Sequence, residues 1–355
     1  MKEIHVNSST FYKVVIGHGI RKQISDYLAK TYSSVMIITD EIVGQLYLND
    51  IVNHLEHEKV FHCIVPVGEK SKGIDTFYRL HTEMLEKGLD RNSLVIALGG
   101  GVVGDLAGFV AATFMRGIDY VQVPTTILAH DSSVGGKVAI NHELGKNLIG
   151  NFYNPVAVIY DVETLESLGE RETRSGYAEI VKEALISDLG MFDTLTSIQL
   201  NSVTTEQLEE HLAFGINVKR KIVEADERES GIRKYLNLGH TLAHALEAEL
   251  GYGELTHGEA VAIGLLFTLH VSEKEIQANV PFERLIHWMK ENHFPIEINH
   301  WNVDSLLEKM KTDKKSVQQR IQMVLLDSVG NPVTKEIGNR KMCNYLESFI
   351  EKLVK

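Results

Sequence analysis

The sequence predicts an α/β N-terminal domain followed by a mainly α-helical C-terminal domain. Over the first 160 residues, short β-branched runs alternate with stretches of helical spacing. This alternation predicts a parallel sheet covered by helices on both faces. From Leu165 onward the strand signal nearly disappears, and no internal repeat is visible. We therefore expect two domains, residues 1–160 and residues 161–355, a division that suits a chain of 355 residues.

Each expected strand is short and rich in Val and Ile, the residue types that favour strands. The expected strands are Ser34–Thr39, Val60–Val67, Leu94–Leu98, Tyr120–Val123 and Val156–Tyr160. In the second half, four segments are expected to form helices, and several of them are apolar on more than one face, which indicates burial. They are Glu179–Ser187, Gln207–Val223, Thr241–Leu250 and Gly258–Ser272. One late exception, residues 321–332, is expected to form a small hairpin.

Composition excludes several classes of protein. The chain has 36 basic and 48 acidic residues, and its net charge of −12 argues against nucleic acid or an anionic membrane as the main partner. The longest apolar run, Ala260–Leu269, is about half the length that a bilayer span requires. The N-terminus lacks the apolar core of a signal peptide. Two distant cysteines, Cys63 and Cys343, favour a reduced pair over a disulfide. We therefore expect a cytoplasmic protein.

A glycine-rich loop follows the third expected strand. Gly99, Gly101 and Gly104 match the pattern GxGxxG between the strand Leu94–Leu98 and the helical stretch Leu106–Met115. Glycine allows the backbone to approach a pyrophosphate, and the start of a helix offers free N–H groups and partial positive charge. The pattern indicates a dinucleotide-binding loop, and a tight turn packed close to the sheet is the alternative.

The acids near this loop depart from an ordinary Rossmann domain. The next strand ends in Pro124-Thr125-Thr126 and has no acid, whereas Asp40 and Glu69 follow two earlier strands. Ligands of open α/β sheets lie beyond the carboxyl ends of the strands, so all these loops could meet one nucleotide. Asp40 has a helix cap as its alternative role. The N-terminal domain is therefore expected to be Rossmann-like, with Thr125 and Thr126 as further contacts.

Histidines in the second half have the spacing of metal ligands. His240 and His244 are four residues apart and share one face of the expected helix, and His257 follows close downstream. Imidazoles with a carboxylate suit a divalent ion such as zinc, which acts as a Lewis acid. Ordinary surface or core histidines are the alternative, because the chain has 16 of them. Spacing leaves open which two histidines bind and which carboxylate joins them; the candidates are Glu179, Glu183, Glu247 and Glu259.

Basic residues recur in glycine- or asparagine-rich segments of this acidic chain. They include Lys137 and Lys146, and the pair at residues 314–315 follows Asp313. Lys182 lies about one helical turn beyond Glu179, and Arg233 precedes Asn237 by four residues. Each could be a solvated surface residue. Together they indicate a substrate with two or more negative charges, since Arg matches carboxylates and Lys offers compact charges to phosphate.

Taken together, these segments resemble the 3-dehydroquinate synthase family of sugar-phosphate cyclases, over nearly the whole chain. The matching motifs are Gly99–Asp105, Pro124–Thr126, Asp131–Lys137, Gly176–Lys182, Arg233–Thr241 and His257–Val261. The resemblance implies a homodimeric enzyme of the shikimate pathway that depends on NAD and a divalent metal. Its active site would lie in the cleft between the two domains, and the cleft would close on the substrate. The metal would be zinc, with cobalt as an alternative.

The resemblance also assigns roles to individual residues. It places the metal on Glu179, His240 and His257, and leaves His244 as a phosphate-side or proton-handling residue. It implies nucleotide binding by Asp40, Glu69, Lys72, Gly100, Gly101, Asp105, Thr125 and Thr126. It implies substrate binding by Asp131, Lys137, Lys146, Asn147, Lys182, Lys219, Arg233, Asn237, His244 and one of Lys314 and Lys315. Catalytic roles fall on Lys137, Lys182, Arg233, Asn237, His244 and Arg116, and the last of these would reach the partner subunit's phosphate site.

One loop departs from the family pattern. The family usually has two residues between the alanine of its Pro-Thr-Thr-x-Leu-Ala motif and the following aspartate, whereas here His130 alone separates Ala129 from Asp131. The path of this loop and its nucleotide contacts are therefore left open.

Three other functions are compatible with parts of the pattern. Another sugar-phosphate cyclase, such as a 2-deoxy-scyllo-inosose synthase, would act on a substrate without a carboxylate, so Arg233 counts against it. A metal-dependent polyol dehydrogenase would not need so many basic residues. A non-catalytic nucleotide sensor would not need the full set of candidate ligands and lysines.

Overall fold

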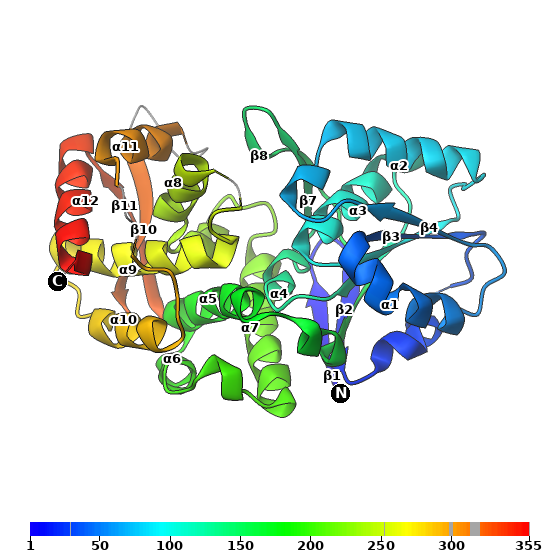
Figure 1. The fold of residues 1–355 in the computed structure, drawn as a ribbon, viewed down its shortest axis with the longest axis horizontal. Helices are drawn as coiled ribbons and strands as arrows, with labels where there is room; N and C mark the ends of the chain where they lie inside the picture. The colour runs from blue at the N-terminus through cyan, green and yellow to red at the C-terminus, as the bar shows by residue number, and fades with distance from the viewer. Residues whose placement is uncertain (29, 252, 298–300, 313–319, 355) are drawn as a thin grey trace. The chain divides into compact units, whose positions relative to one another are not determined.

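The computed structural model describes residues 1–28, 30–251, 253–297, 301–312 and 320–354 (Figure 1). The chain forms two compact units. Unit 1 contains residues 1–169 and 205–228, and unit 2 contains residues 170–204 and 229–355. This division differs from the boundary expected at residue 160, which falls inside strand β9 (Ala157–Asp161). Helix α7 (Thr205–Ala225), expected in the C-terminal domain, belongs to unit 1 because it packs on β1, β2 and α4.

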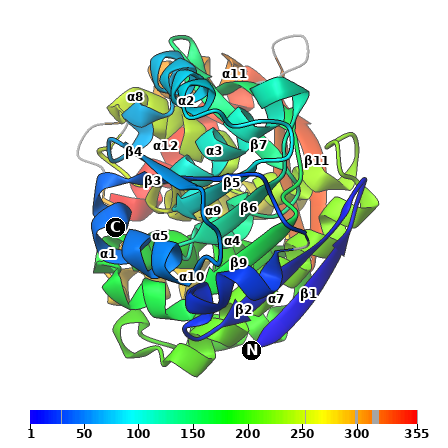
Figure 2. The same cartoon turned by 90° about the vertical axis from the view of Figure 1, so that its right-hand side faces the viewer.

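Unit 1 is built on a seven-stranded sheet in the order β1-β2-β9-β6-β5-β3-β4, which can be followed in Figure 2. Strands β1 and β2 pair antiparallel, and all the other pairs are parallel. The expected parallel sheet is therefore confirmed, whereas the β1–β2 pair was not expected from the sequence. The remaining bounds are β1 (Lys2–Asn7), β2 (Phe11–Gly17), β3 (Val35–Asp40), β4 (Val60–Val65), β5 (Leu94–Gly99) and β6 (Tyr120–Pro124).

Helices cover both faces of this sheet. In β3, Met36 faces the hydrophobic cluster that includes α2 and α3 residues, and Ile37 faces the cluster that includes α1 residues. Because successive strand residues point to opposite faces, a strand covered on both sides is apolar throughout, as β5 is. The helices and turns of unit 1 are η1 (Ile20–Tyr27), α1 (Glu41–His54), η2 (Glu69–Ser71), α2 (Ile74–Glu86), α3 (Gly101–Thr113), η3 (Phe114–Arg116), α4 (Ala129–Ser132) and η4 (Val162–Ser167). A separate hairpin joins β7 (Lys137–His142) to β8 (Gly145–Phe152).

Unit 2 is organised around helix α9 (His257–Ile276), which is buried from Gly258 to Ser272. It packs against α5, α8, α10, α12 and β10. The other helices are α5 (Glu170–Ser187), α6 (Leu189–Leu195), η5 (Leu200–Ser202), η6 (Ile232–Asn237), α8 (His240–Leu250), α10 (Phe282–Glu291), α11 (Val303–Thr312) and α12 (Asn339–Val354). The expected late hairpin is formed by β10 (Ile321–Ser328) and β11 (Asn331–Ile337).

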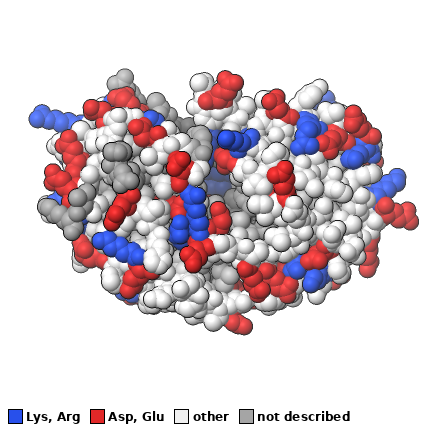
Figure 3. Space-filling model, in the orientation of Figure 1, with Lys and Arg blue, Asp and Glu red and all other residues white. Residues whose placement is uncertain are grey.

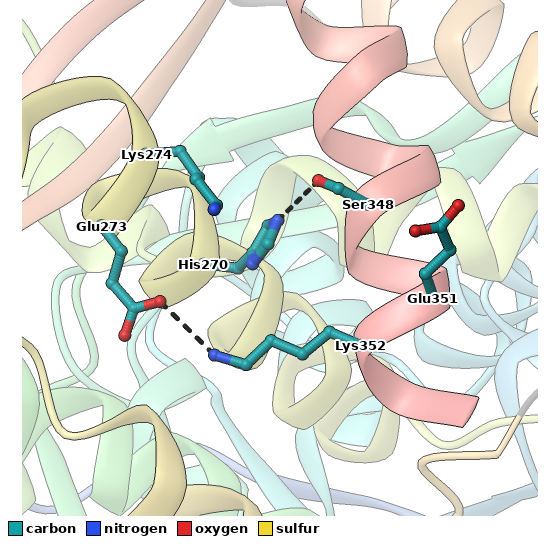
Figure 4. Close-up of a pocket in the computed structure, with 6 residues that line it drawn as sticks. All are labelled: His270, Glu273, Lys274, Ser348, Glu351 and Lys352. Carbon is teal, nitrogen blue, oxygen red and sulfur yellow. Dashed lines mark hydrogen bonds and ion pairs between the residues drawn. The ribbon is translucent and has the colours of Figure 1, made fainter. Parts of the chain in front are cut away.

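Figure 4 shows two of the contacts that join the C-terminal half of α9 to α12. His270 Nε2 lies 2.8 Å from Ser348 Oγ, and Lys352 Nζ lies 3.4 Å from Glu273 Oε2. With Lys274 and Glu351, these four residues line a surface cavity of about 250 Å³. His270 itself is 2% exposed, so its ring is part of the packed interior.

The surface is mixed in charge. On the face drawn in Figure 3, acidic side chains are interspersed with basic ones. Among the described residues, no helix combines the length and the apolar character that a membrane crossing requires.

Candidate functional site

The glycine loop of unit 1 joins β5 directly to α3. A Cβ atom on Gly99 would lie 2.7 Å from Val103 Cβ, so this turn requires glycine. The N-cap of α3, Gly100, provides no side-chain cap, which leaves the first N–H groups of the helix available to an anion. Next to the turn, Thr125 N donates to Gly99 O at 3.1 Å. The buried Thr125 Oγ1 has no hydrogen-bond partner among the described residues. These features fit a pyrophosphate group.

Asp40 takes the helix-cap role that the sequence left as an alternative. Its Oδ1 accepts hydrogen bonds from Ile42 N and Val43 N, each at 2.9 Å, at the start of α1. The carboxylate sits at the carboxyl end of β3, the position where nucleotide ligands bind in such sheets. The cap uses Oδ1, so a ribose contact would fall to Oδ2. Nucleotide binding by Asp40 stays a prediction.

Lys72 links residues from three separate parts of unit 1. Its Nζ lies 2.5 Å from Asp105 Oδ2 on α3 and 2.6 Å from Asn147 Oδ1 on β8. Burial raises the pKa of Asp105, and the Lys72 ammonium opposes that rise. The structure therefore joins two predicted nucleotide residues to a predicted substrate residue.

A second set of contacts extends this cluster. Asn141 Nδ2 donates to Glu69 Oε1 at 2.8 Å, and Asn147 N donates to Asn141 Oδ1 at 3.0 Å. Lys146 Nζ lies 3.9 Å from Glu69 Oε2. Asn141 was missed by the sequence analysis, and its signal was a polar residue that ends the apolar run 138–140 just before Gly145-Lys146-Asn147.

The shortened loop forms the helical turn α4. His130, the single residue between Ala129 and Asp131, is buried, and its Nδ1 donates to Ile127 O at 2.6 Å. Asp131 forms an ion pair with Lys219 on α7 at 2.9 Å. The predicted substrate residues Asp131 and Lys219 thus lie together in unit 1, although 88 residues separate them in the chain.

Two further predicted residues of unit 1, Lys137 and Arg116, lie in segments with positive φ angles. Lys137 is exposed at the start of β7, directly after Gly135 and Gly136, which have φ values of 91° and 65°. Arg116 is also exposed, and it adopts a left-handed φ of 71° next to Met115 at 48°. Such conformations are uncommon for residues other than glycine and cluster at functional sites.

In unit 2, two glycines bring the ligand-bearing helices together. A Cβ atom on Gly258 would overlap the backbone carbonyl of Ser175 on α5, and one on Gly264 would overlap the carbonyl of Gly239. Gly258 N also donates to Ser175 Oγ at 3.1 Å. The first contact sets α9 against α5, which carries Glu179, and the second sets α9 against the start of α8.

Glu179, His240 and His257 form a compact group of potential metal ligands. Glu179 Oε1 lies 3.3 Å from His257 Nε2 and 3.5 Å from His240 Nε2. One donor atom from each residue lies within 4.8 Å of the others. Zinc bonds of 2.0–2.1 Å in a tetrahedral site place neighbouring ligand atoms about 3.3–3.4 Å apart. The two contacts, at 3.3 and 3.5 Å, are close to this spacing, so the three residues fit a four-coordinate divalent metal.

Buried charges of both signs surround this group. Lys182 Nζ lies 2.6 Å from Glu179 Oε2, and both side chains are 1% exposed. Burial alone would raise the pKa of Glu179, but Lys182 and His240 hold it well below its usual range. Burial lowers the pKa of His240 to about 4. For His257, burial is outweighed by the carboxylates of Glu247 and Glu179, which raise its pKa to about 10.

The remaining candidate carboxylates have different surroundings. Glu259 accepts from Arg171 Nε at 3.0 Å and Arg174 Nη2 at 2.7 Å, and it closes a capping box with Thr256, so its role is structural. Glu183 is buried but belongs to neither group of potential ligands among the described residues. Glu247 belongs to a second group, with His244 and His257.

The predicted substrate residues of unit 2 that the structure describes include Arg233 and Asn237 in η6 and His244 in α8. Arg233 is 1% exposed in η6, at the position four residues before Asn237. Asn237 Nδ2 donates to Glu229 Oε1 at 2.7 Å, a partner that the sequence analysis missed. The centroid of the His244 ring lies 5.4 Å from that of His240 and 6.0 Å from that of His257. Lys314 and Lys315 lie outside the described residues.

A unit built on a parallel sheet, followed by a mainly helical unit, is the fold of solved sugar-phosphate cyclases. A structure of 2-deoxy-scyllo-inosose synthase complexed with carbaglucose-6-phosphate, NAD⁺ and Co²⁺ is similar with a TM-score of 0.88 and 24% identity, covering 99% of this chain and 100% of that one. The 2-epi-5-epi-valiolone synthase ValA of Streptomyces hygroscopicus, with NAD⁺ and Zn²⁺ bound, has a TM-score of 0.85 and 24% identity, covering 98% and 99%. These likenesses show the fold.

The sequence comparisons identify the family. Residues 62–175 match the family described as 3-dehydroquinate synthase N-terminal, and residues 176–316 match 3-dehydroquinate synthase C-terminal. The chain is 58% identical over 358 residues to the 3-dehydroquinate synthase of Oceanobacillus iheyensis, covering 100% of both chains. The chain therefore belongs to the 3-dehydroquinate synthase family, as its motifs led us to expect.

Proposed function

We propose that this protein converts 3-deoxy-D-arabino-heptulosonate 7-phosphate to 3-dehydroquinate and inorganic phosphate, as a phosphate lyase and cyclase that uses NAD and a divalent metal. The observation that carries the proposal is the Glu179, His240 and His257 group, whose spacing fits a four-coordinate metal, in a chain of this family. Zinc and cobalt both suit two imidazoles and a carboxylate.

The bound metal would act as a Lewis acid toward substrate hydroxyls. NAD would act as a reversible hydride acceptor. The residues of unit 1 would hold the nucleotide. The N–H groups at Gly100 and Gly101 would bind the pyrophosphate, as they begin α3 without a side-chain cap. Hydroxyls of Thr125 and Thr126 would add contacts, and carboxylates of Asp40 and Glu69 would accept ribose hydroxyls. Lys72 would keep Asp105 in place through its ion pair.

Cationic residues would bind the two ends of the substrate. Arg233, which is buried in η6, would pair its guanidinium with the substrate carboxylate through two parallel bonds. Lys137, Asn237 and His244 would stabilise the leaving phosphate, joined by Arg116 of a second copy of the chain, because preorganised charge favours the developing dianion. The departing phosphate would itself accept the proton that elimination releases.

The remaining predicted residues would position the sugar. Lys182 forms an ion pair with Glu179. In the proposal it would also contact a substrate hydroxyl close to that carboxylate. Asp131 and Lys219, which form an ion pair, would bind hydroxyls together with Lys146 and Asn147. The proposal thus requires residues of both units to act on one substrate, in a homodimer. The free thiols of Cys63 and Cys343 suit a reducing compartment such as the cytoplasm.

The test is turnover with catalytic amounts of NAD. Purified protein, zinc and the heptulosonate phosphate should release phosphate and form a carbocycle in equal amounts, without accumulation of NADH. Accumulation of NADH with a simple polyol would instead indicate a dehydrogenase. Turnover of a hexose phosphate that lacks a carboxylate, with none of the heptulosonate, would indicate a different cyclase.

A further inference from the structure

The second group of potential ligands, His244, Glu247 and His257, shares a histidine with the proposed metal site. We propose that Glu247 is a positioning residue for the metal site: its carboxylate holds the Nδ1 proton of His257, so that Nε2 of the same ring is the ligand atom, and its negative charge strengthens metal binding. This inference rests on the proposed function, because it assigns a role toward the metal of that site.

The two nitrogens of His257 face different carboxylates. Nε2 lies 3.3 Å from Glu179 Oε1, and Nδ1 lies 3.2 Å from Glu247 Oε2. Glu247 is 6% exposed and lies about two helical turns beyond His240 on α8, so one face of α8 carries both residues. An imidazole binds a metal through one nitrogen, and the hydrogen bond of the other nitrogen decides which one.

The two proposed histidine ligands are held in the same way but by different acceptors. His240 Nδ1 donates to the backbone carbonyl of Leu238 at 3.1 Å. A carbonyl is a neutral acceptor, whereas the Glu247 carboxylate is an anion. A carboxylate partner makes the imidazole a stronger metal ligand. His257 is therefore expected to be the more basic of the two ligands.

Two positive charges near the site, one from α9 and one from α5, explain why a negative charge is useful at Nδ1. His257 is the first residue of this helix, where the helix dipole places partial positive charge that opposes a cation. Lys182 adds a full positive charge beside Glu179. Glu247 offsets these positive charges, because it supplies a second carboxylate to the buried site in addition to Glu179.

The experiment measures metal affinity of the chelator-stripped protein by competition with a chromophoric chelator, using Co²⁺ as the probe. Glu247→Gln keeps an acceptor oxygen for Nδ1 but removes the charge, so it should weaken Co²⁺ binding about 10- to 100-fold. The visible spectrum of bound Co²⁺ should keep the wild-type band intensity, since the ligands are unchanged. Glu247→Asp, which keeps the charge, should lose less affinity than Glu247→Gln.

Glu249→Gln is the matched control, because Glu249 lies on the same helix but pairs with Lys309 and Ser305. It should bind Co²⁺ like the wild type. Unchanged affinity in Glu247→Gln would overturn the proposal. So would a collapse of the cobalt spectrum equal to that of Glu179→Gln, which would make Glu247 a direct ligand. Failure of the wild-type chain to bind one metal ion would instead refute the metal site of the proposed function.

Discussion

Gly258 on α9 lies against the backbone carbonyl of Ser175 on α5, and its N–H donates to Ser175 Oγ at 3.1 Å. This contact joins the helix that begins with His257 to the helix that carries Glu179. The proposed ligand group therefore depends on a position where no side chain fits.

Gly258→Ala should separate α9 from α5 and lower both stability and metal affinity. Overpacking of a close contact costs about 1–3 kcal/mol of unfolding free energy, and a backbone overlap lies at the upper end. Urea unfolding and Co²⁺ titration measure the two effects. Gly338→Ala is the control, because a Cβ atom there would lie more than 4 Å from every atom of the described residues. Wild-type metal affinity in Gly258→Ala would contradict this account of the helix contact.

Glu179→Gln should abolish turnover and weaken zinc binding by at least about 100-fold, because it removes the only carboxylate of the proposed ligand set. It also leaves the buried Lys182 ammonium without its anionic partner at 2.6 Å. Metal content after dialysis and phosphate release measure the outcome. Glu170→Gln, an exposed change on the same helix, should leave both at wild-type values. Full zinc occupancy in Glu179→Gln would remove this residue from the ligand set.

Arg233→Ala should raise the KM for the heptulosonate phosphate far more than it lowers kcat. The expected loss of binding free energy is about 2–5 kcal/mol, because the buried guanidinium would otherwise pair with a carboxylate. Lys234→Ala, at the next and partly exposed position, serves as the control. Steady-state kinetics with NAD at saturation provide the measurement, and an unchanged KM would refute the role of Arg233.

His270→Gln should reduce the acid sensitivity of unit 2. Burial, with Lys352 and Lys274 nearby, lowers the pKa of His270 to about 4. Between pH 6.5 and 4 the unfolded chain binds a proton there that the folded chain does not, so stability falls as the pH falls through this window. The contribution of His270 to the loss between pH 7 and pH 5 is about 2 kcal/mol. Urea unfolding at the two pH values should show a correspondingly smaller loss in His270→Gln, and equal losses would contradict the lowered pKa.

The sheet of unit 1 was predictable where its strands are covered on both faces. Strands such as β5 are apolar throughout, and that pattern is visible in the sequence. The β1–β2 pair was missed although both strands carry a strand signal: β1 alternates polar and apolar residues, and β2 contains the apolar run Val14–Ile16. The placement of α7 was missed for a different reason: helical spacing shows which face is apolar, but not which sheet or helix that face packs against.

From residue spacing alone, the kinds of side chain in the candidate site were predictable, but the particular ligands were not. Spacing placed His240 and His244 on one helix face but left four carboxylates open, and only the family resemblance selected Glu179. The structure distinguishes two of the four by their partners: Glu259 is held by Arg171 and Arg174, whereas Glu179 faces two imidazoles. Sequence spacing cannot give this result, because Glu179 and His257 are distant in the chain and meet only through helix packing.

The hydrogen bonds at Nδ1 of His240 and His257 leave each ring with a single available nitrogen. A pocket that offers two such nitrogens and one carboxylate is a poor host for Mg²⁺ and Ca²⁺, which require oxygen-rich coordination. Magnesium, although abundant in cells, would therefore compete weakly for this site. Scarcer ions that prefer imidazole ligands, such as zinc, would bind there instead.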